Sequence, residues 1–215
     1  MSTLFPAAAA AAPLLTGWGL HGWWLRRQLR TARLDPLTGL PTRALFERTA
    51  ARLLRRGPAV VLVIDLDGFK ALNDAHGHAA GDYALRCAAG GLDEVLENTG
   101  PHAVPARLGG DEFAAVIPVA DPVAVPWLLN ALHARLCTPL AFHGHTLTPG
   151  ASIGACLTGE LPVADLSLAL RLADEAMYAA KRGGGGWRIA HGPAPAARTA
   201  NGRRAGRRGT RGVTG

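Results

Sequence analysis

The feature that most constrains the fold is the run Arg107–Phe113, in which two glycines are followed at once by two carboxylates, Asp111 and Glu112. Apolar residues flank this run on both sides. A Gly-Gly pair supplies the positive φ angles that a short hairpin turn needs, so the sequence predicts a β-hairpin over 104–117. Adjacent carboxylates on a turn repel each other unless a cation lies close. A divalent metal that holds phosphates is the obvious candidate.

A second acidic cluster strengthens the metal hypothesis. Residues 60–64 form a continuous apolar run rich in β-branched side chains, which is typical of a strand buried on both faces, and Asp65 follows directly. Mg²⁺ usually takes one or two protein carboxylates and completes its shell with phosphate oxygens. Asp65 and Asp111, at two strand ends, suit that role, and Lys70 is a point charge suited to a triphosphate. Either cluster alone could be a solvated turn, but the two together favour a metal–phosphate site.

Periodicity and turn signals predict an α+β fold. One clear hairpin and an alternation of strands with helices are typical of a ferredoxin-type sandwich. The expected helices cover 41–56, 78–97, 121–136 and 165–182, and the expected strands outside the hairpin cover 59–65, 139–148 and 151–158.

Several of these motifs together resemble the GGDEF family, whose name spells Gly109–Phe113. Further motifs of the family stand around it in order, over roughly residues 34–190. They are Asp35–Pro41, Asp65–Lys70 with Asn73 and Asp74, Gly77 and His78 with Gly81 and Asp82, Ser152–Gly154, and Ala173–Lys181. Six motifs in the right order and spacing are far more specific than one five-residue match.

The resemblance implies a diguanylate cyclase, which condenses two GTP molecules into cyclic di-GMP with release of two pyrophosphates. It implies a palm-like fold, with a central, mainly antiparallel sheet flanked by helices. It also implies Mg²⁺, or Mn²⁺, as the cofactor. Because the family's active site lies between two domains that each bring one GTP, turnover is expected to need a homodimer.

Site residues follow from the resemblance by matching position. Asp65, Asp111 and the carbonyl of Leu66 match metal ligands, Glu112 matches the proton acceptor for the ribose 3′-hydroxyl, and Lys70 matches the residue that steadies the phosphates. The positions that match substrate contacts are Phe69, Asn73, His78, Asp82, Gly109, Gly110 and Lys181. Some have simpler readings: His78 as a solvent-facing helix-start histidine, Asp82 as a helix-start acid, and Lys181 as a surface lysine.

Two positions depart from the family pattern. Lys181 is followed by Arg182 and the glycines Gly183–Gly186, where the family commonly has a Gly-Arg-Asn or Gly-Lys-Asn run. A basic residue that helps to hold the triphosphate is therefore missing, and we expect weaker GTP binding unless Arg182 or Arg188 substitutes. The Arg-x-x-Asp product-inhibition site of many members reads Gly100 to Ala103 here, so we expect no high-affinity product inhibition through it.

Both ends of the chain differ in composition from the middle, which suggests three parts: 1–33, a catalytic domain at 34–190, and 191–215. Residues 4–25 carry no formal charge and arginines follow, so this apolar segment is expected to span or contact the inner membrane with the domain in the cytoplasm. A surface-associated leader or a partner-binding helix are alternatives. The arginine-rich tail is expected to be disordered.

Net charge and cysteine content bear on nucleic-acid binding and on disulfide or metal sites. The net charge of +7 comes from the two ends, and no aromatic residue interleaves the tail arginines, so specific nucleic-acid binding is not expected. The 3 cysteines show no CxxC spacing and are expected to be free thiols. The main alternative to an active cyclase is a GGDEF-fold module that binds GTP or a partner without turnover.

Overall fold

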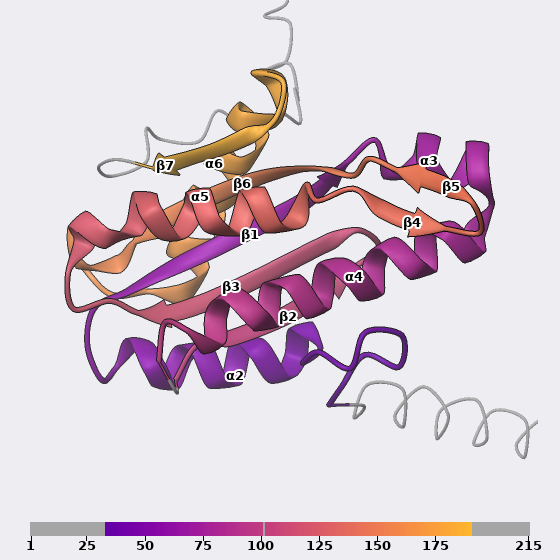
Figure 1. Cartoon of the computed structure of the whole chain (residues 1–215). Helices are drawn as coiled ribbons and strands as arrows, with labels where there is room; N and C mark the ends of the chain where they lie inside the picture. Colours follow the sequence, from indigo (N-terminus) through magenta and orange to yellow (C-terminus); the bar gives the residue numbers. More distant parts are fainter. Residues whose placement is uncertain (1–32, 101, 191–215) are drawn as a thin grey trace, which may run out of the picture.

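A computed structural model describes residues 33–100 and 102–190 (Figure 1). Its helices are α2 (Arg43–Leu54), α3 (Phe69–His76), α4 (His78–Glu97), η1 (Pro122–Ala124), α5 (Val125–Leu136), η2 (Thr158–Glu160) and α6 (Leu166–Arg182). Its strands are β1 (Ala59–Asp67), β2 (Val104–Gly109), β3 (Glu112–Pro118), β4 (Leu140–Phe142), β5 (His145–Leu147), β6 (Gly150–Leu157) and β7 (Gly186–Ala190).

The central sheet has five strands in the order β2-β3-β1-β6-β7. Neighbouring strands are antiparallel except β6 and β7, which are parallel. The predicted mainly antiparallel α+β fold is therefore confirmed. The register places Asp65 of β1 opposite Glu112 of β3 on one side and opposite Ser152 of β6 on the other.

Strand β1 lies at the centre of the sheet because its apolar run can be buried on both faces. Val60, Leu62 and Ile64 belong to one core cluster, together with residues of α4 and α5. Val61 and Val63 belong to the other, with residues of α2 and α6. The sheet is thus the middle layer between two pairs of helices (Figure 1).

Helix α6 packs directly on strand β6, with little side chain between them. A Cβ at Gly154 would stand 1.8 Å from the carbonyl oxygen of Ala173 and 2.3 Å from the backbone nitrogen of Met177. Glycine is therefore required at this crossing, because only a residue without a side chain lets the helix backbone come this close. The contact fixes where the last turn of α6, and Lys181 with it, lies relative to the sheet.

Several elements differ from the sequence expectation. Helix α3 and strand β7 are additional, and the single strand expected over 139–148 is a separate two-stranded hairpin, β4–β5, with left-handed residues His143 and Gly144 at its turn. Helix α4 continues through Gly90 and Gly91.

The predicted apolar membrane segment and the arginine-rich tail lie outside the described residues. Within the part of the chain that is described, no helix combines the length and apolar character needed to cross a bilayer.

Candidate active site

Acidic side chains gather where β1 ends and the β2–β3 hairpin turns. Asp65 stands opposite Glu112 in the ladder between β1 and β3. One residue on, the backbone N–H of Leu66 donates to the carbonyl oxygen of Asp111 at 3.3 Å. The two acidic clusters found in the sequence therefore meet at one edge of the sheet, with Asp65 near the end of β1 and Asp111 in the adjacent β2–β3 turn.

The hairpin turn is held by a partly buried ion pair and the hydrogen bonds around it. Arg107 donates through Nε and Nη2 to the carbonyl oxygen of Gly110, at 3.0 and 2.7 Å, and through Nη1 to Asp35 Oδ1 at 3.0 Å. Thr38 also donates to Asp35 from its backbone N–H and its hydroxyl. Burial alone would raise the pKa of Asp35, but the hydrogen bonds from Thr38 and Arg107 outweigh burial and hold that pKa below its ordinary value.

The two glycines of the turn adopt backbone angles that residues with a side chain avoid. Gly109 has φ 148° and Gly110 has φ 54°, and a bulge falls between Arg107 and Gly109. A guanidinium that binds the turn carbonyl fixes the direction in which the following acids leave the turn. Asp35 and Arg107 therefore position the turn, and the sequence alone had predicted no role for them.

Lys181 brings a cation from α6 into the acidic cluster. Its Nζ donates to Asp65 Oδ1, and the side chain of Asp65 is only 13% exposed. The hydrogen bond with Asp65 raises the pKa of Lys181, and the charges of Asp65, Asp67 and Asp111 act in the same direction. Lys181 therefore lies within electrostatic reach of both predicted metal carboxylates.

Two further acids lie near Asp65. Asp67 accepts hydrogen bonds from the hydroxyl of Ser152 at 2.9 and 3.0 Å, and Ser152 is fully buried. Asp174 of α6 has a raised pKa, because of burial first and then the charge of Glu175, with Asp65 adding to the effect.

Glu112, the predicted proton acceptor, is accessible. Its side chain is 46% exposed, and its carboxylate is 3.9 Å from the guanidinium of Arg43 on α2, which is 52% exposed. An ion pair this open contributes little to stability. The carboxylate of Glu112 is therefore open to solvent.

The predicted guanine contacts lie around the junction of α3 and α4. Asn73 is on α3, and His78 and Asp82 are exposed on the first turns of α4. The amide oxygen of Asn73 is buried and accepts no hydrogen bond from any described residue. It lies against Gly81, where an added Cβ would come within 2.0 Å of it. A buried acceptor without a donor is costly, which sets Asn73 apart from the other predicted substrate contacts.

Lys70 and Phe69 open α3, directly after Gly68 with its left-handed φ of 70°. Lys70 is exposed and Phe69 is partly buried against the core. The sequence missed α3 because its eight residues carry an Asn-Asp pair and end before a glycine, which reads as a loop.

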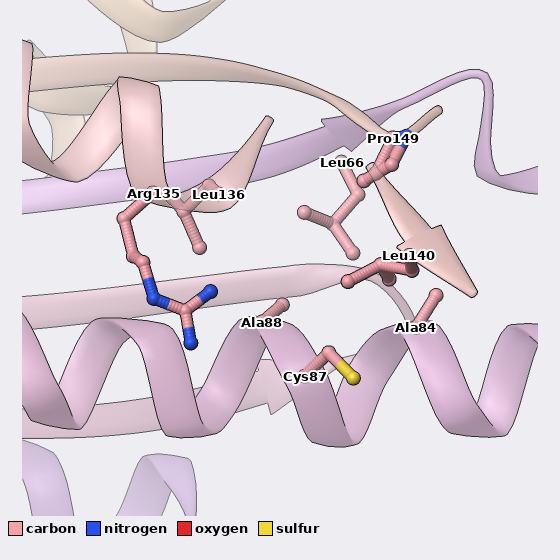
Figure 2. Close-up of a pocket in the computed structure, with 8 residues that line it drawn as sticks. All are labelled: Leu66, Ala84, Cys87, Ala88, Arg135, Leu136, Leu140 and Pro149. Atoms are coloured by element: carbon pink, nitrogen blue, oxygen red, sulfur yellow. The ribbon is translucent and has the colours of Figure 1, made fainter. Parts of the chain in front are cut away.

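Leu66 lines a small pocket, which Figure 2 shows between α4, α5 and the end of β1. Its side chain is 2% exposed. The pocket is lined by Leu66, Ala84, Cys87, Ala88, Arg135, Leu136, Leu140 and Pro149. Its free volume of about 10 Å³ has room for about one water molecule, so the pocket fixes Leu66 rather than receiving a nucleotide.

The glycine run after Lys181 forms a turn into β7. Gly184, Gly185 and Gly186 all have φ between 92° and 98°. A Cβ at Gly185 would stand 3.1 Å from Asp67 Oδ2, and one at Gly183 would stand 3.3 Å from the guanidinium of Arg188. Arg188 therefore folds back from β7 toward the end of α6. The glycine run thus connects the end of α6 to β7, a strand that the sequence did not predict.

The donor set fits a hard divalent cation. The described residues contain no cluster of three acidic, imidazole or thiol side chains that could hold a metal on their own. The carboxylates of Asp65 on β1 and Asp111 in the adjacent turn, with the Lys181 ammonium paired to Asp65, instead match an ion that takes its remaining ligands from phosphates.

Comparison with known proteins places this geometry in a family. The family model described as "Diguanylate cyclase, GGDEF domain" matches residues 32–186. An uncharacterised 19.3 kDa protein encoded in the repSA 5′ region of Streptomyces ambofaciens is 49% identical over 177 residues, which cover 82% of this chain and 93% of that protein. Diguanylate cyclase DgcP of Pseudomonas aeruginosa is 39% identical over 168 residues, which cover 74% of this chain but only 24% of DgcP.

Solved structures agree with the fold. The isolated GGDEF domain of TpbB from Pseudomonas aeruginosa superposes with a TM-score of 0.65 at 36% identity, covering 74% of this chain and 94% of that domain. With the family model, the relatives and the acidic hairpin all in agreement, this chain belongs to the GGDEF family of diguanylate cyclases.

Proposed function

We propose that this chain is an active diguanylate cyclase, which condenses two GTP molecules into cyclic di-GMP and two pyrophosphates. The observation that carries the proposal is the meeting of Asp65, Asp111 and Glu112 at one sheet edge, with the ammonium of Lys181 among them. A module that only binds a partner has no need of two metal carboxylates and a separate accessible carboxylate in one place.

In this proposal the carboxylates of Asp65 and Asp111, with the Leu66 carbonyl, hold Mg²⁺ or Mn²⁺. The bound metal supplies neutralisation of the charge that develops on the α-phosphate. Glu112 accepts the proton of the ribose 3′-hydroxyl. Lys70 and Lys181 bind the phosphates as point charges, and the residues Gly109 and Gly110 leave room for the nucleotide to approach the backbone.

Guanine selectivity rests on Asn73 and Asp82. The buried, unpartnered amide oxygen of Asn73 can accept a hydrogen bond from the guanine edge, and a carboxylate such as Asp82 can accept two. Adenine lacks the adjacent N1–H and N2 amino donors that guanine presents on that edge, so ATP would offer these acceptors fewer hydrogen bonds. His78 and Phe69 complete the set of proposed substrate contacts.

One protomer supplies one set of these residues, so joining two GTP molecules into a ring requires a second copy that faces the first. We therefore propose a homodimer as the active form. Feedback by cyclic di-GMP through the Gly100–Ala103 positions is not part of the proposal, because neither an arginine nor an acid stands there.

The test is product analysis by mass spectrometry after the full chain is incubated with GTP and Mg²⁺. Wild type should yield cyclic di-GMP, and Glu112→Gln should lower the rate by about 10²-fold or more, as expected for loss of a general base. Glu97→Gln, which makes the same change at an exposed acid on the far end of α4, is the matched control and should keep the wild-type rate. Equal rates in Glu112→Gln and wild type would contradict the role of Glu112.

A second candidate function is a GGDEF module that binds GTP without turnover. The glycine run Gly183–Gly186 favours it, because the basic residue that normally helps to hold the triphosphate is absent there. GTP binding with no cyclic di-GMP at any protein concentration would support this second candidate.

A further inference from the structure

Lys181 occupies an unusual place for a residue expected only to bind phosphates. Its ammonium donates to the carboxylate of Asp65, one of the two proposed metal ligands. The contact joins the last turn of α6 to the end of β1, across 116 residues of sequence. Lys181 is 41% exposed, whereas Asp65 is 13% exposed, so the ammonium closes the open side of a mostly enclosed acid.

The surroundings of Lys181 are strongly acidic. Asp65, Asp67 and Asp111 all raise its pKa, and the hydrogen bond with Asp65 does so most. Of these three acids, Asp67 is already satisfied by the hydroxyl of Ser152. Asp111 makes no side-chain hydrogen bond within the described residues. Lys181 therefore pairs directly with one proposed metal ligand, Asp65, and its charge also interacts with the other, Asp111.

We propose that Lys181 is an internal counter-ion that makes this site select the metal–nucleotide complex over the free divalent metal. The inference rests on the proposed function, because it concerns the metal and nucleotide of that same site. A free divalent metal ion must displace the Lys181 ammonium from Asp65. The displaced ammonium then stays close to the two positive charges of the metal and is repelled by them. A metal–nucleotide complex brings phosphate oxygens that take over the displaced ammonium, so the repulsion is relieved.

Other roles for Lys181 make different predictions. A residue that only binds phosphates would weaken nucleotide binding when removed and leave the affinity for free metal unchanged. A residue that only ties α6 to β1 would weaken both affinities when removed, because the carboxylates would lose their placement. Only a counter-ion gives opposite signs, with tighter binding of free metal and weaker binding of the metal–nucleotide complex.

The experiment measures Mn²⁺ binding to the full chain by electron paramagnetic resonance of the free ion. The variants are Lys181→Met and the matched control Arg182→Met, which removes one positive charge from the adjacent exposed residue. Mn²⁺ is titrated alone and with a non-hydrolysable GTP analogue. Thermal unfolding of each variant confirms that it is folded, and Lys181→Gln serves as a second variant.

Lys181→Met should bind Mn²⁺ alone roughly two- to fivefold more tightly than wild type, the range set by a partly exposed ion pair. It should bind the Mn²⁺–nucleotide complex more weakly, and Arg182→Met should resemble wild type with Mn²⁺ alone. Unchanged or weaker binding of free Mn²⁺ in Lys181→Met would overturn the inference, as would an equal gain in Arg182→Met. The predicted Mn²⁺ result without cyclic di-GMP from GTP in wild type would contradict the proposed cyclase and support the counter-ion.

Discussion

Single residues of the site depend on neighbours that take no part in the chemistry. Arg107 binds the turn carbonyl of Gly110 and the carboxylate of Asp35, and both ionic side chains are largely buried, at 13% and 19% exposed. Gly81 does the equivalent for Asn73, because only glycine leaves space for that amide. Two sets of neighbours therefore position the site: Arg107 with Asp35 positions the acidic turn, and Gly81 positions Asn73, the proposed guanine contact.

Asp35 gives a pH-dependent prediction. Its folded-state pKa lies below the ordinary value of 3.8, so its contribution to stability is fully present above pH 3.8 and is lost as the pH falls through the lower folded-state pKa. Asp35→Asn should lower the free energy of unfolding at pH 7 by about 1–3 kcal/mol, since Arg107 loses a charged partner. Urea unfolding of both proteins from pH 7 to pH 3 would test this. A stability difference that stays constant below pH 3.8 would refute the account.

Gly81→Ala tests the support of Asn73. The added Cβ would stand 2.0 Å from the Asn73 amide oxygen, which is the far end of a flexible side chain, so the amide should move rather than the helices. We expect roughly a tenfold loss of GTP affinity or more, the scale of one lost hydrogen bond in a buried site, with little loss of stability. Calorimetric GTP binding and thermal unfolding measure the two effects. Gly90→Ala, at an exposed position of the same helix with open space around it, is the control.

At the scale of elements, the last turn of α6 carries Lys181 to the sheet edge because α6 lies directly on β6. Gly154→Ala would place a Cβ 1.8 Å from the carbonyl oxygen of Ala173, which is backbone and cannot rotate away. The helix should shift away from the sheet, at a cost of about 1–3 kcal/mol or more in the free energy of unfolding. Denaturant unfolding measures that cost. A Gly154→Ala protein as stable as wild type, with unchanged Lys181-dependent Mn²⁺ binding, would show that α6 does not set the site.

Some helices and strands could be predicted from the sequence and others could not. Strand β1 and the acidic hairpin were predictable, because an apolar run buried on both faces and a Gly-Gly turn are local signals. Helix α3 was not predictable, because its Asn-Asp pair and the glycine after it favour a loop, and its packing partner in the fold is α4. Strand β7 was not, because pairing with β6 is a long-range event and its first residue is the last of four glycines.

The residues of the site divide in the same way, into those predictable from local motifs and those that depend on long-range contacts. The candidate metal ligands and the candidate proton acceptor were found because their motifs are adjacent in sequence or lie at predicted strand ends. The ion pairs between Arg107 and Asp35 and between Lys181 and Asp65 join residues 72 and 116 positions apart, and only the packed fold brings them together. The same holds for the contact of Gly81 with Asn73, which needs the angle between α3 and α4.

At the scale of the whole molecule, the account requires two copies. Each protomer offers one set of acids at one sheet edge, and a cyclic product needs two such sets facing each other. Specific activity should therefore rise with protein concentration until the dimer is saturated, and then level off. Activity per protomer that is independent of concentration, in a protein shown to be monomeric by light scattering, would contradict a shared active site.

The most direct test of the central claim is the initial rate of cyclic di-GMP formation by the full chain, measured across protein concentrations beside Asp65→Asn. The account predicts product from wild type, a rate per protomer that rises with concentration, and a loss of about 10²-fold or more in Asp65→Asn, since one metal carboxylate is removed. No cyclic di-GMP from wild type at any concentration, in protein that still binds GTP, would contradict the claim and leave a nucleotide-binding module.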